Sequence, residues 1–264
     1  MRIVRPLGVA AVLVLAGCHL SSDLPSSVPA GVINIIADST GPGQFVVRPV
    51  GTFFKKSNIT IPDSRQVVDS CQYGIYDSTA TSGPIIRDYV NAGPSVGVQT
   101  DQATGTLVPD TSGDVISYVL SDGGALPFTP GSQMTFAVAG SDEFPAMTLT
   151  ANTAGPYAFG PVDTLPSDAL ELTWSPAEGN ESAVVISLQF ASDPNAVRPD
   201  QQIYCSVRDD GAFTVNPQLA VRWRQATPGT RRILSYKWHT TTRVVNGAQF
   251  VVISQFDVAK YTFP

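Results

Sequence analysis

The stretch Thr240–Ile253, T-T-T-R-V-V-N-G-A-Q-F-V-V-I, decides the fold class of this chain. Its Asn-Gly pair at 246–247 supplies the two positive φ angles of a type I′ turn. The runs on either side are rich in β-branched and aromatic residues, which favour strands. The stretch therefore predicts a β-hairpin between the strands Arg231–Val245 and Ala248–Val258.

Similar short runs recur outward from this hairpin, separated by Gly, Pro, Asn and Asp. The strands expected from them are Val32–Ala37, Gln44–Phe54, Gln66–Tyr76, Ser95–Thr100, Val115–Leu120, Gln133–Ala139, Ala146–Ala151, Ala169–Trp174, Ala183–Phe190, Gln201–Arg208 and Ala212–Val215. A helical period is absent except for one turn allowed at Pro217–Trp223. Asp209-Asp210-Gly211 predicts a further turn. The pattern predicts an all-β chain of antiparallel β-sandwiches.

The chain also suggests two domains joined by a linker. Gly and Pro cluster at 152–166, on both sides of Tyr157 and Phe159, which is typical of a boundary. We therefore expect a first β-sandwich domain at 31–151 and a second at 167–264. From Leu170-Glu171-Leu172-Thr173-Trp174 to Asp209-Asp210-Gly211, the second half resembles a β-sandwich module of uncharacterised exported bacterial proteins, and resembles immunoglobulin or fibronectin type III domains. The resemblance implies a fold class and no catalytic residue.

The first residues predict export. Arg2 and Arg5 precede an apolar run, Leu7–Ala16, which is too short to span a bilayer and suits a signal peptide. The run ends in Leu15-Ala16-Gly17-Cys18, which resembles the lipobox of bacterial lipoproteins. That resemblance implies cleavage after residue 17 and a lipid on the Cys18 thiol, whereas the alternative is an ordinary signal peptide with a chance Cys.

The lipobox implies a mature protein held to the cell envelope by its lipid. Residues 18–30 are rich in Ser and Pro, which predicts a flexible tether. His19 follows the Cys instead of Asp, and by the sorting rule of such lipoproteins this favours the outer membrane, on its periplasmic or surface face. The membrane, through this lipid, is the first expected partner.

Composition excludes several classes of protein. A hydrophobic content of 43% is enough for a packed core, and the net charge of −6 disfavours nucleic acid as a partner. The charge is uneven, because residues 18–197 hold five basic and eighteen acidic side chains, whereas residues 198–264 hold nine basic and four acidic ones. Arg222, Arg224, Arg231 and Arg232 lie close together in the sequence. They predict a contact patch for an acidic partner protein or an anionic surface, unless the two halves neutralise each other or the arginines are a solvated rim.

The remaining cysteines suggest one disulfide. With Cys18 acylated, Cys71 and Cys205 are the two left, and two cysteines in an oxidising compartment most simply pair. Strand alternation places each among apolar neighbours, so both are expected to be buried. Two separate buried thiols are the alternative.

Strand alternation also assigns the tryptophans. Leu234, Tyr236 and Trp238 share one face, opposite Ser235, Lys237 and His239. By the same alternation Trp174 and, if its segment is extended, Trp223 are core residues. Buried tryptophans remove the main support for a sugar-binding platform.

Catalytic and metal motifs are sparse. Gly93-Pro94-Ser95-Val96-Gly97 matches a nucleophile elbow, with His239 as the base, but no helical period follows it. Asp101, Asp110 and Asp114 cluster in the loop Thr100–Asp114, where carboxylates could hold Ca²⁺, although Asp is also common in turns. No zinc pair or phosphate loop occurs, so we expect no cofactor.

Three hypotheses follow. The first is a non-catalytic structural or protein-interaction lipoprotein, acting through strand edges and the arginines at 222–232. The second is a binding module for carbohydrate or another extracellular ligand, assisted by calcium. The third is a serine hydrolase using Ser95 and His239, and we do not expect an enzyme.

Overall fold

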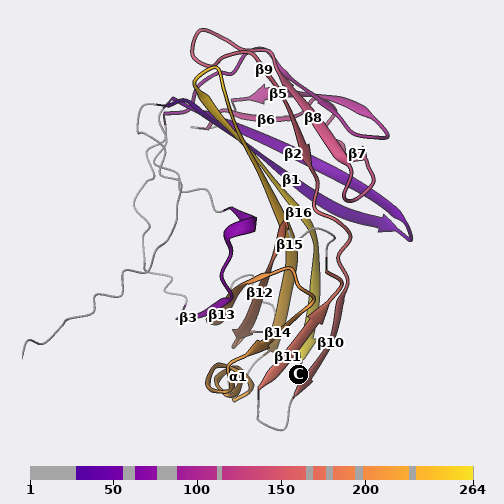
Figure 1. Cartoon of the computed structure of the whole chain (residues 1–264), viewed down its shortest axis with the longest axis vertical. Helices are drawn as coiled ribbons and strands as arrows, with labels where there is room; N and C mark the ends of the chain where they lie inside the picture. The colour runs from indigo at the N-terminus through magenta and orange to yellow at the C-terminus, as the bar shows by residue number, and fades with distance from the viewer. Residues whose placement is uncertain are drawn as a thin grey trace, which may run out of the picture.

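The computed structural model describes residues 28–55, 63–75, 88–111, 115–164, 169–176, 181–193, 199–225 and 230–263. Strands make up most of these ranges, which confirms the all-β class (Figure 1). The predicted signal peptide at 1–17, the lipidation site Cys18 and most of the predicted tether lie outside the described residues. Within the described ranges, no helix is both long and apolar enough to span a membrane.

A single large sheet forms the body of the molecule. Its strands are, in chain order, β1 (Ala30–Gly41), β2 (Gln44–Phe54), β3 (Ser70–Ile75), β4 (Val96–Gln99), β5 (Thr104–Asp110), β6 (Ser117–Leu120), β7 (Leu126–Pro127), β8 (Gln133–Val138), β9 (Met147–Asn152), β12 (Ser182–Ala191), β13 (Gln201–Arg208), β15 (Thr230–Val245) and β16 (Ala248–Phe263). They lie in the order β3-β13-β12-β15-β16-β1-β2-β6-β5-β4-β8-β9, with β7 paired to β2.

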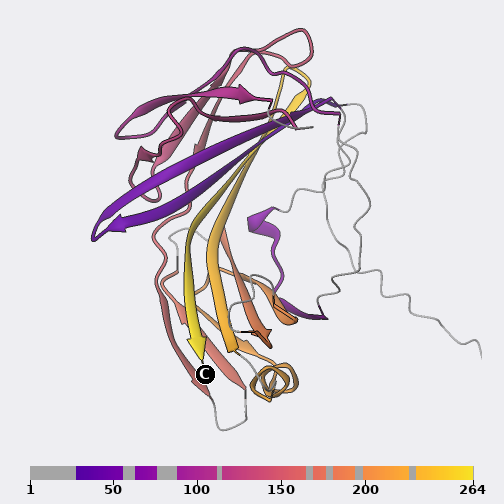
Figure 2. The ribbon, with the colours of Figure 1, turned by 180° about the vertical axis from the view of Figure 1, so that it is seen from behind.

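A second, three-stranded sheet covers the lower part of the large one (Figure 2). It consists of β10 (Phe159–Thr164), β11 (Leu170–Trp174) and β14 (Ala212–Val215), in the order β10-β11-β14. Leu172 of this sheet and Ile186 and Ile233 of the large sheet are fully buried in one core. The two sheets therefore form a sandwich in the second half of the chain.

The final hairpin is the longest element, and β15 and β16 run from the upper to the lower part of the molecule (Figure 1). Its turn is as the sequence predicts, with φ of 50° at Asn246 and 78° at Gly247. One pairing corrects the expectation of a wholly antiparallel sheet, because β1 pairs with β16 in parallel. Since β1 and β16 belong to opposite ends of the chain, no hairpin turn constrains their direction.

Several predicted boundaries need correction. Three strands, β5, β7 and β10, were not expected; β5 lies within the predicted Thr100–Asp114 loop, and β10 lies within the predicted 152–166 linker. The predicted strand Gln66–Tyr76 starts only at Ser70, after a 3₁₀ turn at Ser64–Gln66. These segments carry Gly, Pro or Asp, whose low strand propensity is overridden by pairing with neighbouring strands.

The large sheet crosses the proposed domain boundary twice. β1 pairs with β16, and β3 pairs with β13, so strands of the 31–151 segment join strands of the 167–264 segment. One buried cluster also contains residues of both segments. The division into two domains stays a prediction.

The faces of β15 differ from the expected ones. Ser235 and Lys237 are fully buried and His239 is 6% exposed, whereas Leu234 and Tyr236, which were expected in the core, are only partly buried. Ser235 and Lys237 point into the core between the two sheets, where they contact Tyr157 and Asp209, whereas His239 lies at the 3₁₀ turn. Trp174, Trp223 and Trp238 are buried, as expected.

Candidate functional site

Helix α1 (Pro217–Arg224) carries the first two of the predicted arginines. Asn216 caps it, because its side-chain oxygen accepts a hydrogen bond from the Gln218 N–H at 2.8 Å, and Pro217 presets φ in the first turn. The expected helical turn is thus confirmed, and the alternative of an extended segment with Leu219, Val221 and Trp223 on one face is wrong. Ala220 and Trp223 pack into the core, which leaves Arg222 exposed on the opposite side.

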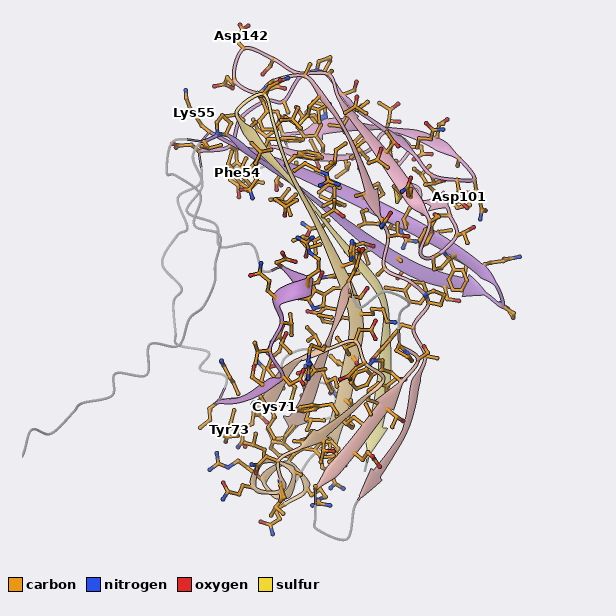
Figure 3. The ribbon with its side chains drawn as sticks, viewed as in Figure 1. Phe54, Lys55, Cys71, Tyr73, Asp101 and Asp142 are labelled. Atoms are coloured by element: carbon orange, nitrogen blue, oxygen red, sulfur yellow. A yellow bond between two sulfur atoms is a disulfide. The ribbon has the colours of Figure 1, made fainter. Side chains whose placement is uncertain are left out.

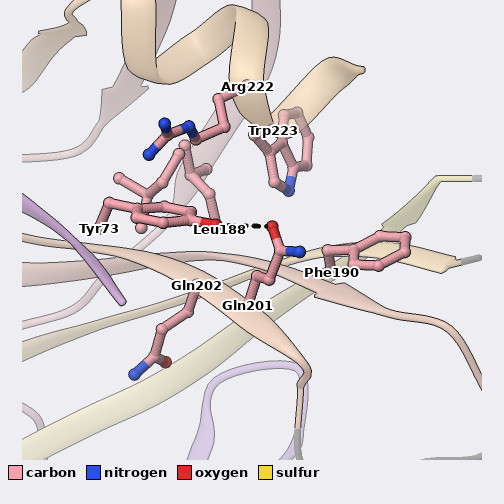
Figure 4. Close-up of a pocket in the computed structure, with 8 residues that line it drawn as sticks. Tyr73, Leu188, Phe190, Gln201, Gln202, Arg222 and Trp223 are labelled. Atoms are coloured by element: carbon pink, nitrogen blue, oxygen red, sulfur yellow. Dashed lines mark hydrogen bonds between the residues drawn. The ribbon is translucent and has the colours of Figure 1, made fainter. Parts of the chain in front are cut away.

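Arg222 lies over a tyrosine from a distant segment. Its guanidinium carbon is 4.2 Å from the centroid of the Tyr73 ring, a cation–π contact (Figure 4). Tyr73 belongs to β3, and its hydroxyl donates to Oε1 of Gln201 on β13 at 3.0 Å. Stacking limits the rotation of the guanidinium and leaves its N–H groups, which lie in the plane, available at the edge.

The disulfide Cys71–Cys205 holds this tyrosine in place. The two cysteines are directly opposite each other in the β3–β13 pairing, and 134 residues separate them along the chain. The predicted bridge is confirmed, with Cys205 fully buried but Cys71 only partly, because β3 lies at the edge of the sheet. Tyr73, two residues from Cys71, lies at the same end of the molecule as α1 (Figure 3).

An open depression of about 400 Å³ lies beside Arg222. Its lining residues are Gln201, Gln218, Val221, Arg222 and Gln225. Glutamine amides both donate and accept hydrogen bonds, whereas the guanidinium only donates. The depression therefore suits an extended polar ligand that carries negative charge.

The other predicted arginines lie at the same end of the molecule as α1. The Arg231 guanidinium lies over the Trp223 ring, 5.7 Å from its centroid, and Nη1 of Arg231 donates to the Arg224 carbonyl at 3.1 Å. Arg232 follows on β15, opposite Gln189 of β12, and strand alternation points it to the face away from α1. We call Arg222, Arg224, Arg231 and Arg232 the arginine surface, because α1 and the start of β15 place all four at one end of the body.

Sequence reasoning missed the residues that complete this surface. Strand alternation predicts that Tyr73 shares a face with Cys71, and the predicted disulfide places that strand beside Cys205. Together these two predictions were the one sequence signal for the position of Tyr73. Nothing in the sequence placed α1 over this strand pair, so the stacking of Arg222 on Tyr73 and the roles of Gln201 and Gln218 depended on the tertiary structure.

A second cluster is an ion pair inside the core. Nζ of Lys237 lies 2.9 Å from Oδ2 of Asp209, and both side chains are fully buried. Nζ also donates to the carbonyls of Ser175 at 3.0 Å and Pro156 at 3.3 Å, and Trp174 Nε1 donates to Oδ1 of Asp209 at 2.8 Å. The three N–H groups of the ammonium thus each have an acceptor, so this pair joins the two sheets as a structural element.

His239 lies in a third cluster, at the 3₁₀ turn. Its Nδ1 is 3.0 Å from the Glu181 carbonyl, which fits an Nδ1–H donor, and its Nε2 is 3.3 Å from Oγ1 of Thr241. The buried Ser64 donates to the same carbonyl at 2.6 Å and accepts from Thr240 N–H at 3.1 Å. These bonds attach the turn to β12 and β15, and they hold His239 in a buried, hydrogen-bonded position.

The Ser95 segment has the architecture of a structural turn. β4 follows Ser95, where a nucleophile elbow requires a helix. The buried Tyr118 hydroxyl lies 2.7 Å from the Gly93 carbonyl and accepts from Ala92 N–H at 2.8 Å, and burial raises the pKa of Tyr118. His239 is hydrogen-bonded at the 3₁₀ turn, six strands away across the sheet from β4, so Ser95 and His239 form no catalytic pair.

The aspartates proposed for calcium do not converge. Asp101 accepts hydrogen bonds from Thr129 N–H at 3.0 Å and from Ser132 Oγ at 3.2 Å. Burial raises the pKa of Asp101, but its hydrogen bonds together outweigh this effect, so the pKa is lowered. Asp110 lies at the far end of β5, about 20 Å from its start at ~3.3 Å per residue. Asp114 lies outside the described residues, and within the described ranges no three His, Cys, Asp or Glu side chains are grouped as for a metal ion.

Comparison with known proteins gave no relative from which to transfer a role. No protein-family model matches the chain, and a search of curated proteins found no match.

Proposed function

We propose that this protein is a lipid-anchored, non-catalytic interaction module of the bacterial cell envelope, which binds an acidic partner protein through the arginine surface. The observation that carries the proposal is the gathering of Arg222, Arg224, Arg231 and Arg232 at one end of the body, beside an open polar depression. Positive charge concentrated on one surface attracts acidic partners and steers their approach.

Two features support export and anchoring. The lipobox at Leu15–Cys18 is the sequence signal, and the Cys71–Cys205 disulfide is of a kind that persists in oxidising compartments. A protein with Cys18→Ser should lose palmitate labelling and leave the membrane fraction, with the unchanged chain as control. Labelling that persists in the variant would contradict the anchor.

The fold separates the two ends of the molecule. The chain enters the sheet where the Gln249 N–H donates to the Pro29 carbonyl, at the hairpin end of β15 and β16. Val244 of β15 pairs with Gln249 at this hairpin end, and Arg231 is at the other end of β15. At ~3.3 Å per residue, the strand separates Arg231 from Val244 by about 40 Å. An anchor before residue 28 would thus join the body at the end opposite the arginine surface, which favours a protein partner over the lipid of that bilayer.

In-cell photocrosslinking tests the interaction. A photoreactive residue at the exposed Gln218 should give a discrete protein adduct, whereas one at Val244, 68% exposed at the other end of β15, should not. The double variant Arg222→Glu/Arg224→Glu should abolish the adduct, and the matched exposed Arg243→Glu should keep it. No adduct at 218, or an adduct that survives the double charge reversal, would contradict the proposal.

A further inference from the structure

We propose that the depression beside α1 binds carboxylate side chains of an extended acidic peptide segment, with Arg222 as the carboxylate-binding residue and Tyr73 as the residue that positions it. This inference rests on the proposed function and specifies the chemistry of its partner. The structural basis is the cation–π contact between the Arg222 guanidinium and the Tyr73 ring at 4.2 Å (Figure 4). Arg222 also lines the depression.

Arg222 has the geometry of a carboxylate receptor. A guanidinium fixed in one plane presents parallel N–H groups that match the two oxygens of a carboxylate. Tyr73 fixes that plane from below, and its own hydroxyl is held by Gln201 at 3.0 Å. Because the disulfide and the β13 pairing hold β3, the guanidinium is ordered before a ligand arrives, which lowers the entropy cost of binding.

The rest of the lining fits a peptide backbone. Gln201, Gln218 and Gln225 offer amide donors and acceptors, which is what the N–H and C=O groups of an extended chain require. Arg224 on α1 and Arg231 on β15 add positive charge beside Arg222, which increases the attraction for a segment with several carboxylates. This spacing of cations favours a segment with several acidic side chains over a single acidic group.

A sugar ligand fits this place less well. Carbohydrate sites use exposed aromatic faces, but Arg222 covers the ring of Tyr73 and Trp223 is 6% exposed, with its Nε1 donating to the Gln189 carbonyl at 3.0 Å. The residues that line the depression include no aromatic one, and of the aromatic residues of the adjoining pocket in Figure 4, Phe190 is 7% exposed and thus buried like Trp223. A peptide is thus favoured over an acidic glycan.

Fluorescence anisotropy with a labelled hexaglutamate peptide tests the site, using the purified lipidated protein in detergent micelles. Binding should saturate and weaken as salt rises, and hexaglutamine should not bind. Arg222→Gln should weaken binding about 10-fold or more, since a charge-assisted bidentate contact is lost. Arg222→Lys should weaken it several-fold, and Arg243→Gln should leave it unchanged.

Variants at Tyr73 separate positioning from folding. Tyr73→Leu removes the ring under Arg222 and should weaken peptide binding about 3- to 10-fold, whereas Tyr73→Phe keeps the ring and should restore most of it. Thermal unfolding of each variant checks that the fold is intact. If Tyr73→Leu and Tyr73→Phe weaken peptide binding equally, or if Tyr73→Leu does not weaken it, the positioning role is overturned.

The remaining outcomes are decisive as well. Equal, Arg222-dependent binding of tri-galacturonate or of phosphatidylglycerol vesicles would replace the peptide by a glycan or a lipid surface and overturn the inference. If the hexaglutamate peptide does not bind, while the crosslink at position 218 still depends on the arginines, the inference is overturned and the proposed function still holds. Peptide binding without any crosslink in cells would support the carboxylate site and overturn the proposed function.

Discussion

Nζ of Lys237 lies 2.9 Å from Oδ2 of Asp209, and neither side chain is exposed to solvent. The two residues belong to β15 and to the turn after β13, and their further partners, Trp174 and the Ser175 carbonyl, belong to β11 and its end. This pair connects the large sheet with the small one at a place where the sequence suggests a solvated lysine and an ordinary turn aspartate.

Removing one partner of this pair should be costly. Lys237→Met or Asp209→Leu leaves an uncompensated charge or an unsatisfied Trp174 N–H in the core, and should lower the free energy of unfolding by about 3–5 kcal/mol. The double variant should recover a large part of that loss, because no lone charge remains. Urea unfolding measures all three, with Asp69→Asn at the exposed Asp69–Arg208 pair as a control that shifts the midpoint little. A double variant as unstable as the sum of the two would contradict this account.

The disulfide should stabilise the protein through its long loop. Closing 134 residues is worth about 5 kcal/mol in the chain-entropy model, so Cys71→Ser/Cys205→Ser should unfold at clearly lower urea. Reductant should destabilise the unchanged protein and leave the double variant unaffected. Detection of two alkylatable thiols in the unreduced native protein would contradict the bridge.

The ion pair between Asp69 and Arg208 should respond to acid. The hydrogen bond from the Arg208 side chain lowers the pKa of Asp69 below the 3.8 of an unperturbed Asp. Because folding favours the ionised form, its contribution to stability is complete above that value and is lost as pH falls through the lower, folded-state pKa. An NMR titration of the Arg208 amide, which donates to Oδ1 of Asp69 at 2.8 Å, should show a midpoint below pH 3.8. In Asp69→Asn that step should vanish, and a step above pH 3.8 in the unchanged protein would contradict the lowered pKa.

The Gly93–Gly97 motif should prove structural. Gly93 has a φ of 111°, and an added Cβ would lie 2.4 Å from the Gly140 carbonyl oxygen, so Gly93→Ala should cost about 3 kcal/mol. Ser95→Ala should change the unfolding free energy by less than about 0.5 kcal/mol. A serine-reactive fluorophosphonate should label neither the unchanged protein nor the alanine variant. Labelling lost only in Ser95→Ala would revive the hydrolase hypothesis.

The sequence by itself determined the local elements whose signals are short-range. The Asn246-Gly247 turn, the ends of β2, β13 and β14, the helical turn within 217–223 and the burial of Trp174 and Trp238 follow from turn chemistry, strand patterns and alternation. It also indicated the pairing of Cys71 with Cys205, because few cysteines leave few choices.

The tertiary structure decided everything that depends on contacts between distant segments. The parallel pairing of β1 with β16, the burial of Lys237 against Asp209 and the stacking of Arg222 on Tyr73 join residues that no local pattern relates. Alternation tells which side chains share a face of a strand, but which face is covered depends on the layers packed against it. For that reason the sequence predicted an arginine patch, but only the fold showed that Arg222, Arg224 and Arg231 meet at one helix and that Arg222 lines a polar depression.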